Sequence, residues 1–215
     1  MTGVPDANEL DNLMALAMDF ALQAGEVHRL RATGNVASKS TATDPVTQVD
    51  REAEALIAEA IREARPNDAI LGEESTLVEG TSGFQWVIDP LDGTVNYLYD
   101  FPSYGVSIGI ETDGEPVVGV VFDTAINHLF AARRDDKATK NGAEIRVTSC
   151  SELSLALLGT GFAYAPAVRE RQAKITGALL PKVRDIRRSG SCAVDLCSVA
   201  AGRLDAFYEL SLIHI

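Results

Sequence analysis

The segment Trp86-Val-Ile-Asp-Pro-Leu-Asp-Gly-Thr-Val-Asn96 places a short apolar run directly before two carboxylates, a proline and a glycine. The apolar run favours a β-strand over 86–88, and we expect it to stop at Asp89-Pro90 because proline cannot donate to a sheet ladder. After the turn, Gly93-Thr94 can begin a short helix, whose unpaired N–H groups attract anions. The segment therefore predicts carboxylates and an anion-binding backbone within one turn of chain.

Two other segments carry acids to the ends of predicted elements. Glu73 and Glu74 follow a predicted strand over 69–71, and Asp50 is the third-position acid of a helix N-cap at Thr47. A single acid at such a place is usually solvated or capping, but three segments together are harder to explain in that way. Because neither Cys nor His joins them, these hard oxygen ligands favour Mg²⁺ or Mn²⁺ over zinc.

The periodicity of the remaining chain predicts alternating helices and strands. We expect an amphipathic helix over 8–30, a loop over 31–46, a helix ending near 64 and an antiparallel meander over 106–132. A second αβ unit follows, with strands over 155–158, 183–186 and 206–208 and helices over 167–180 and 191–201. We expect residues 1–150 to form an α+β domain with the metal and phosphate site, and residues 151–215 to form an incomplete αβ domain.

Composition narrows the functional class. The 215 residues are 46% hydrophobic and carry a formal net charge of −12, which disfavours binding to nucleic acid or to anionic membranes. The three cysteines have no metal-type spacing, and we find no signal peptide and no apolar run long enough to cross a bilayer. We therefore expect a soluble cytoplasmic protein with reduced thiols.

The two acidic motifs, Gly72-Glu-Glu-Ser75 and the segment 86–96, resemble those of the inositol monophosphatase family. Further matches extend over nearly the whole chain: Lys39, the Thr47-x-x-Asp50 element, Phe101-Pro102, Val106-Ser-Ile-Gly109, Gly190-Ser-Cys-Ala193 and Glu209. The resemblance implies a layered α+β sandwich of alternating α and β layers, and a Mg²⁺-dependent, lithium-sensitive phosphatase. It also implies a homodimer for the complete protein.

The resemblance also implies a role for each matching residue. Metal would be held by Glu73, Asp89, the Leu91 carbonyl and Asp92, while phosphate would be held by Asp92 and the N–H groups of Gly93 and Thr94. Glu73 and Thr94 would orient the attacking water, with Asp50 holding Thr94 by a hydrogen bond. Supporting positions would be Glu74 and Lys39, and the alcohol part of the substrate would face Ala193, Asp195 and Glu209.

The sequence departs from the family pattern after Glu209. The family has a Trp-Asp pair a few residues later that supplies the last metal ligand, whereas this sequence reads Leu-Ser-Leu-Ile-His-Ile over 210–215. We therefore expect a truncated chain in which one metal site lacks a carboxylate. A non-catalytic binding protein or an inactive fragment is the alternative from another functional class.

Rival chemistries are weaker. Haloacid-dehalogenase-type phosphatases form an aspartyl phosphate on an Asp-x-Asp motif, but Asp89-Pro-Leu-Asp92 has one residue too many. Catalysis by His28, His128 or His214 is not expected, Cys192 and Cys197 are expected to pack, and the basic cluster Lys182, Arg184, Arg187 and Arg188 is expected on a solvated face. Inositol monophosphate is the expected substrate, with histidinol phosphate, fructose 1,6-bisphosphate and nucleotide phosphates as alternatives.

Overall fold

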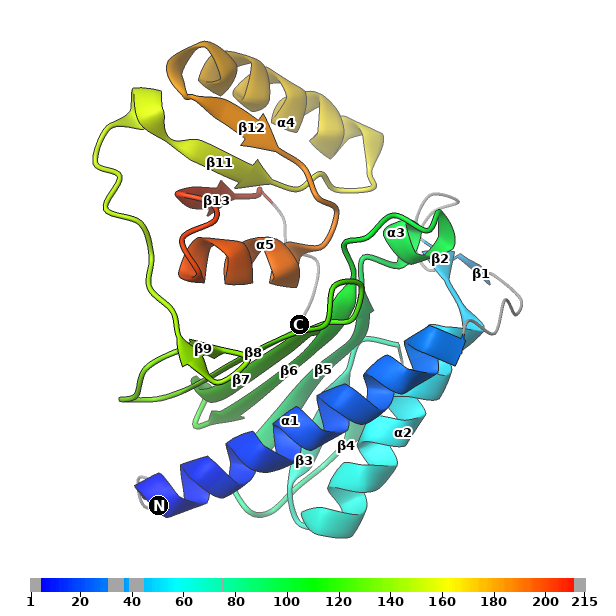
Figure 1. Ribbon diagram of the computed structural model, residues 1–215. Coiled ribbons are helices and arrows are strands. Elements are labelled where there is room, and N and C mark those ends of the chain that lie inside the picture. The colour runs from blue at the N-terminus through cyan, green and yellow to red at the C-terminus, as the bar shows by residue number, and fades with distance from the viewer. Residues whose placement is uncertain (1–4, 31–36, 39–44, 75, 211–215) are drawn as a thin grey trace.

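The protein is a stack of alternating helical and sheet layers in a computed structural model that describes residues 5–30, 37–38, 45–74 and 76–210. Helices α1 (Ala7–Leu30) and α2 (Gln48–Ala64) cover one face of a large sheet, and helix α5 (Cys192–Ala200) covers the other. A small sheet lies over α5, and helix α4 (Pro166–Leu179) forms the outermost layer (Figure 1). The predicted layered α+β sandwich is confirmed.

The large sheet has the strand order β10-β9-β8-β7-β6-β5-β3-β4 in the described part of the chain. Strand β3 runs parallel to β5, and the other neighbours are antiparallel. The predicted meander is present as β6, β7 and β8. The strand bounds are β3 (Ala69–Gly72), β4 (Leu77–Val78), β5 (Phe84–Asp92), β6 (Gly105–Thr112), β7 (Glu115–Asp123), β8 (His128–Arg133), β9 (Thr139–Lys140) and β10 (Ala143–Glu144).

The prediction that the strand after residue 86 stops at Asp89-Pro90 is wrong, because β5 continues to Asp92. Its pairing with β6 shifts register between Asp89 and Asp92, which is the signature of a bulge. Pro90 lies inside that irregular stretch, where its missing N–H removes no ladder hydrogen bond. The strand therefore accommodates proline at the point where the chain begins to turn.

The main core lies between the large sheet and the two N-terminal helices. Small and branched residues of α1, including Leu13, Ala17 and Ala24, are fully buried against the sheet, where Trp86 and Ile88 are also fully buried. This is the apolar face that the helical periodicity of the sequence predicts. No helix of the described residues is both long and apolar enough to cross a membrane.

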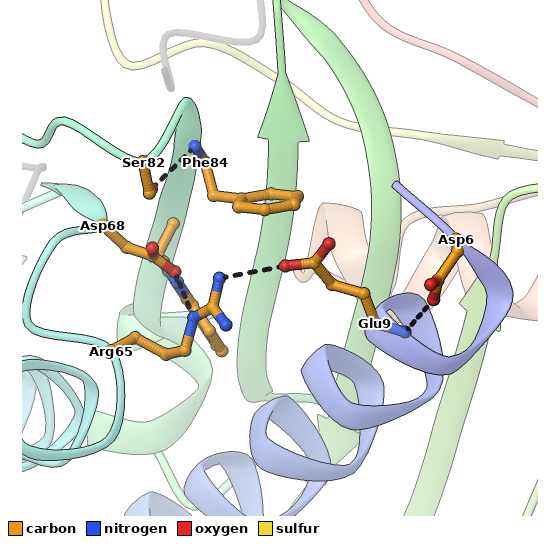
Figure 2. A network of polar contacts seen from close by, with 7 residues as sticks. Asp6, Glu9, Arg65, Asp68, Ser82 and Phe84 are labelled. Atoms are coloured by element: carbon orange, nitrogen blue, oxygen red, sulfur yellow. Dashed lines mark hydrogen bonds and ion pairs between the residues drawn. The ribbon is translucent and has the colours of Figure 1, made fainter. Parts of the chain in front are cut away.

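A polar network fastens both helices to the start of β5, at the strand end far from residues 89–92 (Figure 2). The Arg65 guanidinium lies 2.8 Å from Asp68 and 3.5 Å from Glu9 of α1, and it stacks over the Phe84 ring. Asp68 also accepts a hydrogen bond of 2.9 Å from the indole N–H of Trp86. Strand β5 is therefore fixed to the helical layer at its beginning.

The small sheet has the order β12-β11-β13, with both pairs parallel. Its strands are β11 (Leu157–Thr160), β12 (Asp185–Arg187) and β13 (Ala206–Tyr208). The predicted domain boundary at residue 150 falls between β10 and β11 and stays a prediction. The remaining elements are helix α3 (Thr94–Leu98), the strands β1 (Ala37–Ser38) and β2 (Pro45–Val46), and the 3₁₀ turns η1 (Leu153–Leu155) and η2 (Leu180–Lys182).

Candidate active site

The turn from β5 into α3 depends on Gly93. This residue has φ of +95°, in the left-handed region that favours glycine. A Cβ atom at this position would also lie 2.8 Å from the carbonyl oxygen of Ser103. Both conformation and space therefore require glycine where the chain leaves Asp92 and begins α3.

Asp50 reaches this turn from the first turn of α2. It forms a capping box with Thr47, whose side chain receives the N–H of Asp50 while the Asp50 carboxylate receives the N–H of Thr47. The buried Thr94 hydroxyl lies 3.0 Å from Oδ1 of Asp50 and 3.1 Å from the Leu91 carbonyl oxygen. Helix capping and the geometry of Thr94 are therefore coupled through one carboxylate.

Glu73 follows β3, the strand parallel to β5. The N–H of Glu73 donates to the Ile88 carbonyl at 3.0 Å, which places this residue beside the final part of β5. The N–H groups of Glu74 and Thr76 donate to the Glu54 carboxylate at 2.7 and 3.0 Å. A Cβ at Gly72 would lie 2.5 Å from the Glu54 carboxyl carbon, so the loop closes tightly around that side chain.

Glu54 is a contributor that the sequence interpretation missed. It is 2% exposed on α2, on the same buried side as Ala53, Ile57 and Ile61. A carboxylate within an apolar helical face is the signal that identifies it, because a buried charge needs hydrogen-bond donors. The N–H groups of Glu74 and Thr76 supply them.

Asp92 connects the large sheet to helix α5. Its Oδ2 accepts hydrogen bonds of 2.6 Å from the Ser191 hydroxyl and of 2.6 Å from the Ala193 N–H, at the N-terminus of α5. Loss of solvent raises the pKa of Asp92, its hydrogen bonds at Ser191, Ala193 and Cys192 lower it, and the nearby Glu73 carboxylate raises it. Asp92 thus stands near a like charge and is held by donors from α5.

A pocket lies beside this contact, and it contains two of the three residues expected to face the substrate alcohol. Asp92, Asp195 and Glu209 line it, together with Arg188. Ala193 is not among its lining residues, and its N–H donates to Asp92. Burial raises the pKa of Asp195, and the negative charge of Asp92 adds to this shift.

Arg188 is exposed, in keeping with the expected solvated basic face, and it also lines the pocket. Its guanidinium carbon lies 6.0 Å from the centre of the Phe162 ring, and both residues line the pocket. Sequence spacing did not reveal this position because Arg188 and Phe162 come from segments that are distant along the chain. Lys39 lies outside the residues whose side chains the structure describes.

Cys192 and Cys197 are unsuited to nucleophilic chemistry. Burial raises the pKa of each thiol to about 12, and the neighbouring carboxylates of Asp92 and other acids raise it as well. Thiols with such a pKa stay protonated near neutral pH. This agrees with the expectation that they pack.

The comparisons with known proteins agree with this arrangement of strands, turn and acids. The model of the inositol monophosphatase family matches residues 9–215. The chain belongs to the inositol monophosphatase family. Members of this family are phosphatases, and this chain is accordingly an enzyme of the phosphatase class.

Individual relatives support the family assignment. The chain is 42% identical over 231 residues to the inositol-1-monophosphatase SuhB of Mycobacterium tuberculosis, covering 95% of this chain and 78% of the relative. It is 43% identical over 178 residues to the Nus factor SuhB of Escherichia coli, covering 82% and 67%. The crystal structure of the extragenic suppressor protein suhB from Bartonella henselae superposes with a TM-score of 0.87 at 34% identity, covering 94% of this chain and 78% of that one.

Proposed function

We propose that this inositol monophosphatase family member hydrolyses a small phosphate monoester, inositol monophosphate, with Mg²⁺ and an activated water. The observation that carries the proposal is the Asp92 contact. The Asp92 carboxylate lies near Glu73 and just before α3, and it accepts hydrogen bonds from the N-terminus of α5. It also lines the pocket that contains Asp195 and Glu209. This arrangement joins candidate metal ligands to a cavity for an alcohol.

The donor set fits a hard divalent cation. Glu73, Asp89, Asp92 and the Leu91 carbonyl offer only oxygen atoms, and the effect of Glu73 on the pKa of Asp92 shows negative charges in proximity. Among the described residues, no three His, Cys, Asp or Glu side chains are placed as a finished coordination cluster. The four residues named would hold the cation.

When bound, Mg²⁺ lowers the pKa of a coordinated water and neutralises charge on the phosphate and on the leaving oxygen. The protein residues supply position. We assign phosphate binding to Asp92 and the backbone N–H groups of Gly93 and Thr94, and orientation of the water to Glu73 and the Thr94 hydroxyl. Asp50 holds Thr94 through the 3.0 Å contact between their oxygens. Glu74 and Lys39 have supporting roles.

The alcohol of the substrate is assigned to the pocket. Asp195 and Glu209 provide hydrogen-bond acceptors for hydroxyl groups, and Ala193 contributes through the α5 N-terminus that holds Asp92. The name of the Mycobacterium tuberculosis relative supports an inositol phosphate as substrate. We further propose lithium sensitivity, a cytoplasmic location and a homodimer, in keeping with the family resemblance.

The test is release of inorganic phosphate from inositol 1-phosphate, histidinol phosphate and fructose 1,6-bisphosphate, with and without Mg²⁺. We expect Mg²⁺-dependent release that is greatest with inositol 1-phosphate and that falls by at least about 100-fold in Asp92→Asn, since Asp92 serves both metal and phosphate. Asp113→Asn is the matched control, because Asp113 is an exposed residue of the β6–β7 turn. Mg²⁺-independent release, or an acid-trapped phosphoryl group on Asp89, would contradict the proposal; binding without release would favour a non-catalytic protein.

A further inference from the structure

His28 is a buried polar residue that the proposed chemistry leaves unexplained. It lies in the last turn of α1 and is 1% exposed. Its Nε2 is 2.9 Å from the Pro90 carbonyl oxygen, and its Nδ1 is 3.2 Å from the Thr124 hydroxyl. The ring therefore connects α1 to the bulge of β5 and to the residue that follows β7.

The partners fix the protonation of the ring. A carbonyl oxygen only accepts, so Nε2 carries the proton and donates to Pro90, while Nδ1 accepts from the Thr124 hydroxyl. Burial lowers the pKa of His28 to about 4, so one neutral tautomer persists at neutral pH. His28 thus acts as a fixed donor toward Pro90.

The bonded carbonyl belongs to the residue between Asp89 and Leu91. A bulge gives up regular ladder hydrogen bonds, so its peptide groups need other partners to fix their orientation. Within this bulge the Leu91 N–H donates to the Asp89 carboxylate at 3.1 Å. His28 adds a contact from outside the strand, on the residue that joins two of the proposed cation ligands.

The surroundings hold His28 in place. The Tyr97 hydroxyl of α3 donates to the His28 carbonyl oxygen at 3.1 Å. The rings of Tyr97 and Tyr104 lie 6.0 and 6.2 Å from the imidazole, and both tyrosines are buried. The imidazole is therefore a rigid support and not a side chain that samples many rotamers.

We propose that His28 is a positioning residue: by holding the Pro90 carbonyl, it fixes the backbone that presents Asp89 and Leu91 and so sets the affinity of the site for Mg²⁺. This inference rests on the proposed function, in which Asp89 and Leu91 hold the cation. His28 itself contacts neither cation nor substrate.

The test is titration of the substrate-free protein with Mg²⁺ alone by isothermal calorimetry. His28→Gln keeps an amide N–H close to the position of Nε2, whereas His28→Asn places its amide close to Nδ1 and leaves the Pro90 carbonyl unbonded. We expect the Kd for Mg²⁺ to rise about 10-fold or more in His28→Asn, as is typical when a group that orients metal ligands is lost. In His28→Gln we expect the Kd for Mg²⁺ to stay within about 3-fold of the wild-type value, because the variant keeps a donor to the Pro90 carbonyl.

Two further variants separate positioning from general loss of stability. Leu10→Ala opens a cavity in the buried face of the same helix without touching the turn, and we expect its Kd to be unchanged at a lowered Tm. Thr124→Val removes the hydroxyl that bonds Nδ1 and helps to hold the ring in place. We expect a weakened Kd in this variant even if His28→Asn does not fold. Equal affinity in His28→Asn, Thr124→Val and wild type would overturn the inference, as would equal losses in His28→Asn and Leu10→Ala.

Failure of the proposal for His28 can be distinguished from failure of the proposed function. If the wild-type protein binds Mg²⁺ but releases no phosphate, the catalytic proposal fails while the role of His28 is still decided by the variants. If the wild-type protein binds no Mg²⁺, both proposals are overturned.

Discussion

At the scale of single residues, a substitution of Glu54 tests whether this buried carboxylate holds the loop that carries Glu73 in its conformation. The Glu54 carboxylate accepts from the N–H groups of Glu74 and Thr76 through its two oxygens. In Glu54→Gln one of these oxygens becomes an NH₂ group, which cannot accept, so one of the two N–H groups faces another donor. We expect a loss of stability of about 1–3 kcal/mol and a roughly 10-fold weaker response of activity to Mg²⁺. The measurements are thermal melting and phosphate release against Mg²⁺ concentration. The exposed Glu59→Gln on the same helix should change neither, and wild-type behaviour of Glu54→Gln would refute this role.

Asp123 is a second residue for which we make a prediction, because its buried carboxyl group should make the stability of the protein depend on pH. It is 1% exposed, and burial raises its pKa to about 6, although the N–H groups of Ile126 and Ala125 and the charge of Arg203 lower it. Because the folded-state pKa is above the ordinary value of 3.8, the folded protein takes up this proton first as the pH falls. The stabilising contribution of Asp123 is thus complete below pH 3.8 and is lost as the pH rises through about 6. We expect Asp123→Asn to melt above wild type at pH 7.5, and the difference to shrink as the pH falls through about 6 and to vanish below pH 3.8. Melts across this pH range measure it, and a constant difference would contradict the raised pKa.

At the scale of elements, local rules account for much of the fold and for one error. Helical periodicity predicted α1 and α2, and the Thr47–Asp50 capping signal marks the start of α2. The rule that proline ends a strand failed at Pro90 because a bulge removes the need for its N–H. The site was harder to predict where it depends on distant segments. Glu54, Arg188 and His28 acquire their partners only when helices and strands pack, so no local spacing reveals them.

The polar network at the start of β5 should contribute to the free energy of unfolding without affecting the proposed Mg²⁺ site. Asp68→Ala leaves the Trp86 indole N–H buried without its acceptor and removes the main partner of Arg65. We expect a loss of about 2–4 kcal/mol, which corresponds to a fall in Tm of roughly 5–15 °C for a chain of this size. Calorimetric melting measures the loss, and Mg²⁺ titration should give the wild-type Kd because the network lies at the opposite end of the strand from Asp92. A weakened Kd would show that the two ends of β5 are coupled.

At the scale of the whole molecule, the proposed chemistry depends on how the two sheets are joined. Asn96 of α3 donates through Nδ2 to the Ser103 carbonyl at 2.6 Å and to the Ser189 carbonyl at 2.8 Å. The second bond connects α3 to the turn before α5, whose Ser191 and Ala193 hold Asp92. Gly190 in that turn has φ of +99°, and a Cβ there would lie 2.6 Å from Nδ2 of Asn96. The turn therefore fits closely against Asn96, and the position of α5 controls both the pocket and Asp92.

Asn96→Asp tests this connection, because a carboxylate of the same shape cannot donate to the two carbonyl groups. Two buried acceptors then lose their donor and face a negative charge, so we expect a loss of about 1–3 kcal/mol and a fall in Tm of roughly 3–10 °C. Since α5 carries one wall of the pocket and the donors to Asp92, we also expect KM for the phosphate ester to rise and kcat to fall together. Gly190→Ala should reproduce the pattern from the other side of the contact, by strain and by collision with Asn96. Loss of stability in both variants with unchanged KM and kcat would mean that the contact joins the layers without organising the site.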